Sequence, residues 1–150
     1  MLPLIAIARQ SDYVREAGDN KGLRVEAIQH AAGGSFGDSW CVEMFWVWID
    51  FWTKGNSPFP RGLNSEELRQ LAISKGWQIV DPEPGCCVIN IVNGRGEHTA
   101  MCTEPLPLVT IAGNTSPDGL STNGDGVHEH PVSSVGKFYF RVPNPNNLPI

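Results

Sequence analysis

The feature that most constrains this chain is an apolar run from Val42 to Trp52 in which only Glu43 and Asp50 are charged. Four of the five tryptophans lie between Trp40 and Trp52. A segment that is apolar on nearly all sides is typical of a helix buried in a protein core. The run is shorter than the roughly 18–20 residues that cross a bilayer, and its two carboxylates disfavour insertion. The sequence therefore predicts a core helix.

Cys41 directly precedes this run, in the first turn of the predicted helix. Asp38 or Ser39 is suited to cap the helix, because either side chain can accept hydrogen bonds from free backbone N–H groups. The same N–H groups and the helix dipole stabilise a thiolate and lower a cysteine pKa from its usual value of about 8.5. Cys41 is therefore a candidate nucleophile. The alternative is a small, buried, unreactive cysteine.

The composition is typical of one soluble globular domain spanning residues 1–150. Hydrophobic residues make up 41% and charged residues 18% of the 150 positions, which suffices for a single core. The net charge of −5 and the pI near 5.3 disfavour nucleic acid or an anionic membrane as partner. Adjacent Cys86 and Cys87 lie in an apolar run typical of a strand, not of a disulfide framework. No Cys-x-x-Cys spacing suggests zinc, so we expect neither a metal nor a cofactor.

The N-terminal segment 1–9 is apolar but short and has no basic leader, which makes it a poor secretory signal. We therefore expect synthesis in the cytoplasm without a signal peptide and without membrane insertion. A target outside the cell would then require delivery by another route.

Helical patterns fill the first half of the chain and strand patterns the second. The predicted helices are 9–17, 22–31, the apolar run that ends at Trp52 and has Cys41 in its first turn, and a fourth helix to about Lys75, capped by Asn64 or Ser65 and ended by Gly76. Apolar runs between turn residues predict five strands at 86–92, 98–102, 108–112, 126–130 and 137–142. Helices followed by strands indicate an α+β fold with an antiparallel sheet.

His98 and Asn114 are candidates for the base and for the group that orients it, both of which a cysteine nucleophile needs. His98 opens one predicted strand and Asn114 ends the next, and antiparallel neighbours place these two ends at the same edge of a sheet. A triad with Cys41 requires the sulfur and the imidazole to approach within roughly 3–4 Å. In isolation, His98 also fits a half-exposed turn, and Asn114 a turn beside Gly113.

The histidines of the last part of the chain allow a second interpretation. His128 and His130 alternate on a predicted strand, so both side chains face one side and could bind a metal with His98. A solvated strand face is the favoured explanation.

In chain order, these motifs resemble the CHAP and NlpC/P60 cell-wall cysteine hydrolases, most closely the small phage-type CHAP proteins. The likeness covers nearly the whole chain and includes Arg15-Glu16, Asn20-Lys21-Gly22, Val25, Trp40-Cys41, Pro84-Gly85, His98-Thr99, Gly113-Asn114-Thr115, Gly124-Asp125-Gly126-Val127 and Phe140-Arg141. The chain departs from the pattern at Cys86, where relatives usually have Asp after Pro-Gly. It departs again at His128-Glu129-His130, where relatives often carry basic residues.

The resemblance implies a papain-like fold and a peptidoglycan amidase or endopeptidase. Cys41 would attack an amide of the peptide stem, His98 would act as base and then as acid, and Asn114 would orient the imidazole. The backbone N–H of Cys41 would donate to the oxyanion, an interaction typically worth about 2.7–4 kcal/mol. Asp38 and Ser35 are the nearest polar candidates for a second donor.

Three further residues are candidates for the substrate groove. Core packing explains most of the tryptophans, but Trp40, beside the nucleophile, is expected to line the cleft. Glu16 and Asn20 would shape the groove; alternatively, they end the first helix.

An enzyme of this kind acts in the periplasm or cell wall as a phage-type lysin or a secreted antibacterial effector, after delivery by a holin or a secretion apparatus. An effector toxin further implies a cognate immunity protein that plugs the cleft. The alternative is a non-catalytic virion or binding module that retains the fold, and a third possibility is hydrolysis of a different amide.

Overall fold

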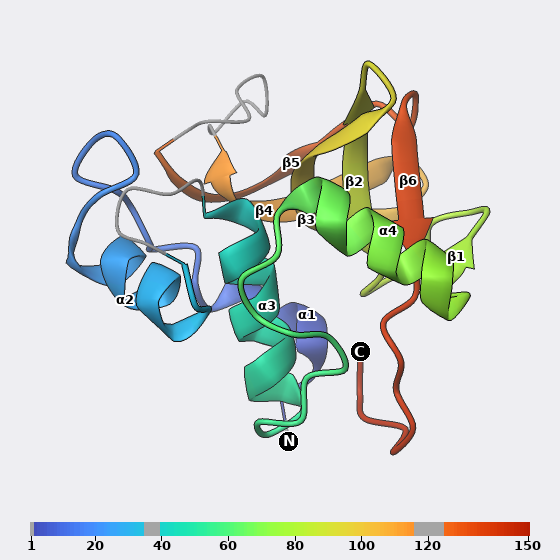
Figure 1. Cartoon of the computed structure of the whole chain (residues 1–150), viewed down its shortest axis with the longest axis horizontal. Coiled ribbons are helices and arrows are strands. Elements are labelled where there is room, and N and C mark those ends of the chain that lie inside the picture. The colour runs from blue at the N-terminus through green and yellow to red at the C-terminus, as the bar shows by residue number, and fades with distance from the viewer. Residues whose placement is uncertain (1, 35–39, 116–124) are drawn as a thin grey trace.

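Six antiparallel strands form one sheet, and four helices lie against it and beside it (Figure 1). The computed structural model describes residues 2–34, 40–115 and 125–150, and these counts refer to those ranges. The helices are α1 (Leu4–Arg9), α2 (Leu23–Ala31), α3 (Cys41–Trp52) and α4 (Ser65–Lys75). The strands are β1 (Gln78–Ile79), β2 (Cys87–Val92), β3 (Arg95–Pro105), β4 (Leu108–Thr115), β5 (Gly126–Pro131) and β6 (Lys137–Phe140). The predicted α+β class is confirmed, with strand order β1-β6-β2-β3-β4-β5.

Three of the four predicted helices are confirmed, and the first is wrong. The first helix is α1, which ends at Arg9, whereas residues 10–17 form turns and extended backbone. Arg15 pairs with Gly126 at the start of β5, and the Glu16 N–H donates to the Asp125 carbonyl at 2.7 Å. Pairing with the sheet thus outweighs the local helical tendency of this segment.

All five predicted strands are present, with one shift that matters for function. β3 begins at Arg95, so His98 lies inside the strand and does not open it. Strand β1 was not predicted, because its two residues carry no pattern of their own and are held only by pairing with β6.

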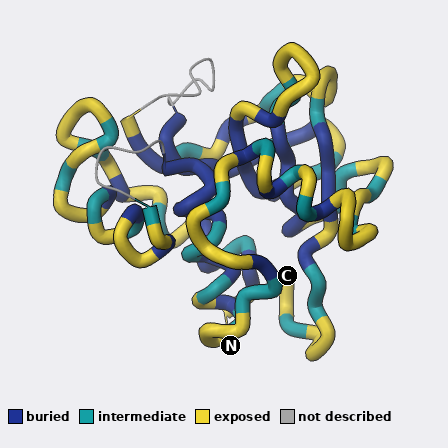
Figure 2. The backbone as a smooth tube through the Cα atoms, in the orientation of Figure 1, coloured by how far each residue is buried: buried dark blue, intermediate teal, exposed yellow. Residues whose placement is uncertain are grey.

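The core lies between α3 and the sheet, whose strands β3 and β4 and the first half of β2 are mostly buried (Figure 2). α3 buries Phe45, Trp48, Ile49 and Trp52, as the predicted core helix requires. No helix among the described residues is both long and apolar enough to cross a membrane.

Successive side chains of β2 and β3 enter two different apolar clusters. Ile89 and Met101 belong to the main core on the helix side of the sheet. Val88 and Ala100, their neighbours in sequence, belong to a second cluster on the other side. This alternation decides which residues of β3 face the helices.

The start of α3 docks closely on β4 at a single glycine. A Cβ atom placed on Gly113 would lie 2.7 Å from a ring carbon of Trp40 and 2.8 Å from Cβ of Met44. Only a residue without a side chain permits this approach, which fixes the position of the residue preceding Cys41.

We therefore predict that Gly113→Ala lowers the free energy of unfolding by about 2 kcal/mol, because the added methyl overpacks the contact. Trp40→Phe should relieve part of this cost, so the double variant should be more stable than the sum of the two single effects. Urea unfolding of the four proteins measures the coupling. Additive effects would contradict a direct clash between positions 40 and 113.

Candidate active site

Cys41 is the first residue of α3, within the first turn where the sequence places it, but the helix cap differs from the prediction. The cap position is Trp40, whose side chain makes no capping hydrogen bond. Asp38 and Ser39, the predicted caps, and Ser35, a candidate oxyanion donor with Asp38, lie outside the described residues.

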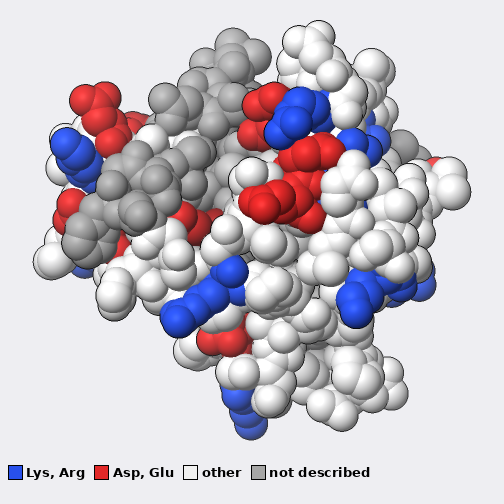
Figure 3. Space-filling model, in the orientation of Figure 1, with Lys and Arg blue, Asp and Glu red and all other residues white. Residues whose placement is uncertain are grey.

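Cys41 lines an open pocket of about 450 Å³ between the start of α3, the segment that leads into α4, and the turn between β2 and β3. Its lining residues are Gly34, Cys41, Val42, Glu43, Gly62, Leu63, Asn64, Ser65, Glu66, Glu67, Arg95, Gly96 and Glu97. Four of these carry a carboxylate and one a guanidinium, so the pocket is acidic. Figure 3 shows acidic residues, drawn in red, gathered near the start of α4.

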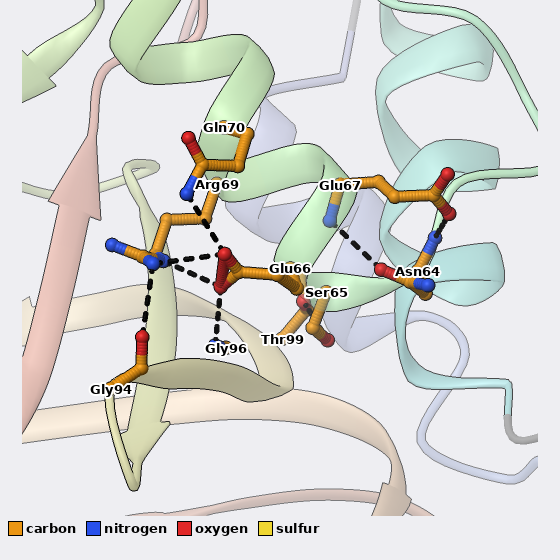
Figure 4. Close-up of polar contacts among 9 residues, drawn as sticks. All are labelled: Asn64, Ser65, Glu66, Glu67, Arg69, Gln70, Gly94, Gly96 and Thr99. Carbon is orange, nitrogen blue, oxygen red and sulfur yellow. Dashed lines mark hydrogen bonds and ion pairs between the residues drawn. The ribbon is translucent and has the colours of Figure 1, made fainter.

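Two of the four carboxylates stabilise the pocket wall (Figure 4). Glu66 accepts hydrogen bonds from Arg69, from Gln70 and, at 2.7 Å, from the backbone N–H of Gly96. The Arg69 guanidinium is the main reason why the pKa of Glu66 falls to about 2. Glu67 and Asn64 form a capping box at the start of α4. These contacts hold α4 against the β2–β3 turn.

Ser65 connects the Cys41 pocket to the sheet. Its hydroxyl lies 3.8 Å from the Cys41 sulfur and 2.7 Å from the Thr99 hydroxyl of β3, and all three residues are buried. The side chain of β3 that faces the Cys41 side of the sheet is therefore that of Thr99. Ser65 was foreseen only as a helix cap, because its position beside Cys41 depends on tertiary docking that no local motif encodes.

His98 faces the opposite side of the sheet. Its side chain lines a cavity of about 20 Å³ together with Thr110, Thr115, His130 and Lys137, among others. Since neighbouring side chains of a strand point to opposite faces, His98 and Thr99 cannot both face α3. The structure therefore does not bring His98 together with Cys41.

A β-bulge sets this orientation of His98. Gly96 pairs with Ile91 and His98 pairs with Asn90, so Glu97 is an extra residue on β3. Asn90 lines the cavity that His98 lines, whereas Ile89, opposite Thr99, belongs to the main core. The place of the bulge thus decides which face the imidazole occupies.

Asn114 is fully buried near the end of β4, with a left-handed backbone (φ 57°). It follows Gly113, which packs on Trp40, and precedes Thr115, which lines the His98 cavity. The β3–β4 pairing runs as far as Met101 opposite Ile111. Beyond this pair β4 is irregular between Ala112 and Thr115, so the pairing does not fix where His98 and Asn114 lie relative to each other. Their predicted neighbourhood stays a prediction.

The three residues predicted to line the substrate groove make contacts within the fold. Trp40 is fully buried, so its predicted place in the cleft lining is wrong. Its indole N–H donates to the Glu16 carboxylate at 3.1 Å, and Glu16 lines a separate pocket with Arg15 and Arg24. Asn20 accepts a hydrogen bond at its backbone oxygen from the Gln29 side chain of α2. Trp40 is buried because its large indole ring gains stability when its apolar surface is removed from water.

Of the three histidines considered as metal ligands, the structure brings only two together. His130 and His98 line one cavity, whereas the His128 ring lies 2.8 Å from the Asp125 carboxylate. Among the described residues, no three His, Cys, Asp or Glu side chains gather in a way that could hold a metal ion.

Comparison of the chain with models of protein families, with curated proteins and with solved structures finds no match. The family resemblance rests on the ordered sequence motifs.

The buried imidazole predicts a pH dependence of stability. Burial, and secondarily the Lys137 ammonium, lower the pKa of His98 to about 4, below the value near 6.5 expected in the unfolded chain. Between these two values the unfolded chain binds more protons, so stability falls as the pH falls. From pH 7 to pH 5 the loss from this group is about 2 kcal/mol.

Urea unfolding of the wild type and of His98→Gln at both pH values isolates this contribution, because the carboxylates are common to both proteins. The variant should lose less stability than the wild type on acidification. Equal losses would show that His98 is accessible to protons in the folded protein.

Proposed function

We propose that this chain is a papain-like cysteine hydrolase that cleaves an amide bond in the peptide stem of peptidoglycan, with Cys41 as nucleophile. The observation that carries the proposal is the position of Cys41 at the first residue of α3, on the wall of an open pocket. The ordered motifs that resemble the cell-wall hydrolases supply the substrate class.

The chemistry follows from the helix start. The Cys41 thiolate attacks the amide carbonyl, the amine leaves, and water releases the acyl group from the sulfur. Backbone N–H groups at the start of α3 have no partner within the helix, and that of Cys41 would stabilise the oxyanion. The leaving amine requires a proton, which is the task of the base after it has deprotonated the thiol.

His98 can serve as this base only if it faces α3. Moving the bulge of β3 from Glu97 to Thr99 would set His98 opposite Ile89, the position that Thr99 now occupies beside Ser65. The pairing of residues 96 and 100 would stay unchanged. We propose that substrate binding selects this arrangement, with Asn114 as the orienting group. A general base contributes about 10²–10⁴-fold, so His98→Ala should remove most turnover and Asn114→Ala less.

Delivery and partners follow from the substrate. The protein would reach the wall as a phage-type lysin released by a holin, or as an effector injected by a secretion apparatus. In the effector case, a cognate immunity protein would cover the acidic Cys41 pocket, and a basic insertion would complement its carboxylates.

The principal test is digestion of purified peptidoglycan followed by mass spectrometry of the products. Wild type should release peptides or peptide-free glycans, and Cys41→Ala should reduce release more than about 1,000-fold, because loss of a nucleophile removes the covalent route. Cys86→Ala is the matched control, since it removes a buried cysteine outside the pocket, and it should stay active. Equal release by wild type and Cys41→Ala would refute the proposal, and the products identify the bond.

A non-catalytic binding module is the second candidate, and the separation of Cys41 from His98 by the sheet favours it. Such a module would sediment with peptidoglycan sacculi, with and without Cys41, and would release no soluble product. Release that depends on Cys41 excludes it.

A further inference from the structure

Cys86 and Cys102 face each other across the antiparallel pair β2–β3. Cys87 pairs with Met101, and the next step of the ladder sets Cys86 opposite Cys102. The Cys102 N–H donates to the Cys86 carbonyl at 2.9 Å, which confirms this register at the backbone. Directly opposed residues of antiparallel strands have Cα atoms roughly 4.5–5.5 Å apart, within the range that a disulfide spans.

The two side chains also lie on the same face. Both residues are buried and belong to the second apolar cluster. Cys87 points to the main core on the other side of the sheet, so it cannot compete for either sulfur. All four cysteines are free thiols in this structure.

The two thiols differ in access and in ionisation. Cys86 lines a pocket of about 160 Å³ that also contains Glu83 and Arg141, whereas Cys102 does not line it; both residues are buried. The interaction between the two side chains lowers the pKa of Cys86 and, together with burial, raises the pKa of Cys102. The thiol beside the pocket is thus the one that ionises more readily, as an attacking thiol requires.

We propose that Cys86 and Cys102 form a peroxide-reactive pair that closes to a cross-strand disulfide. The pocket admits an oxidant as small as hydrogen peroxide and is too small for a tripeptide disulfide. This reactivity is independent of the hydrolase activity proposed for Cys41.

The steps balance as follows. The Cys86 thiolate attacks one peroxide oxygen, the O–O bond breaks, and the departing hydroxide takes up a proton to give water, which leaves a sulfenic acid on Cys86. The Cys102 sulfur then attacks the Cys86 sulfur, the S–O bond breaks, and the hydroxide leaves as a second water with the proton of Cys102. Two thiols lose two electrons in total, and the peroxide is reduced to two waters.

The experiment treats the reduced, folded chain with hydrogen peroxide, blocks remaining thiols and maps the tryptic peptides without reduction. Peptides 76–95 and 96–137 should appear joined, and reduction should separate them. Because Cys86 and Cys87 share the first peptide, the variants Cys86→Ala and Cys87→Ala are compared. The link should persist in Cys87→Ala and be absent from Cys86→Ala.

Absence of the link in oxidised wild type, or its persistence in Cys86→Ala, would overturn the proposal. If Cys86→Ala does not fold, fragment ions of the joined wild-type peptides locate the bond at residue 86 or 87 and decide equally. In Cys102→Ala, a sulfenic-acid probe should label Cys86, because the sulfur that closes the disulfide is absent. Lack of labelling there would refute Cys86 as the attacking thiol.

Discussion

The alternation of side chains along β3 governs how this molecule can act. Thr99 and Met101 face α3 and the main core, and His98 and Ala100 face the interior on the other side of the sheet. A single extra residue, Glu97, sets this phase. With the bulge there, Cys41 faces a buried hydroxyl pair, and the imidazole lies behind the strand. With the bulge at Thr99, the same sequence would present the imidazole to the sulfur. A local irregularity of the backbone thus separates the observed arrangement from the one that the proposed activity requires.

The surroundings of Cys41 are fixed more firmly than those of His98. α3 is anchored by its buried aromatic residues and by the contact of Trp40 with Gly113. The pocket wall is held by the Glu66 network and by the capping box of α4. By contrast, Nδ1 of His98 has no hydrogen-bond partner among the described residues, and its cavity is large enough for one water molecule. A firmly held pocket at Cys41 and an imidazole with few polar contacts are the properties that the proposed shift of the β3 bulge on substrate binding would require.

Local signals in the sequence predicted those parts of the fold that depend on local physics. The apolar run predicted α3 and its end at Trp52, and a cap at Asn64 or Ser65 with Gly76 as the stop predicted α4. The helix predicted at 9–17 is absent because Arg15 in this segment pairs with the start of β5, which is distant in sequence. The prediction that His98 lies beside Cys41 failed for a related reason. Cys41 at a helix start follows from local pattern, but the face that His98 occupies depends on a bulge, and no turn residue or periodicity marks Glu97 as an insertion. Trp40 was assigned to the cleft although its size and its contact with Gly113 bury it.

The separation of Cys41 and His98 by the sheet is tested most directly by the pH dependence of Cys41 alkylation in wild type and His98→Gln. Iodoacetamide labelling of Cys41 is followed at each pH by peptide mass spectrometry, without substrate. An imidazole on the far side of β3 leaves the thiol unaffected, so the two pH–rate curves should coincide. A curve that moves to higher pH when the imidazole is removed would show that His98 pairs with Cys41 in the free protein, and would contradict the strand phase described here.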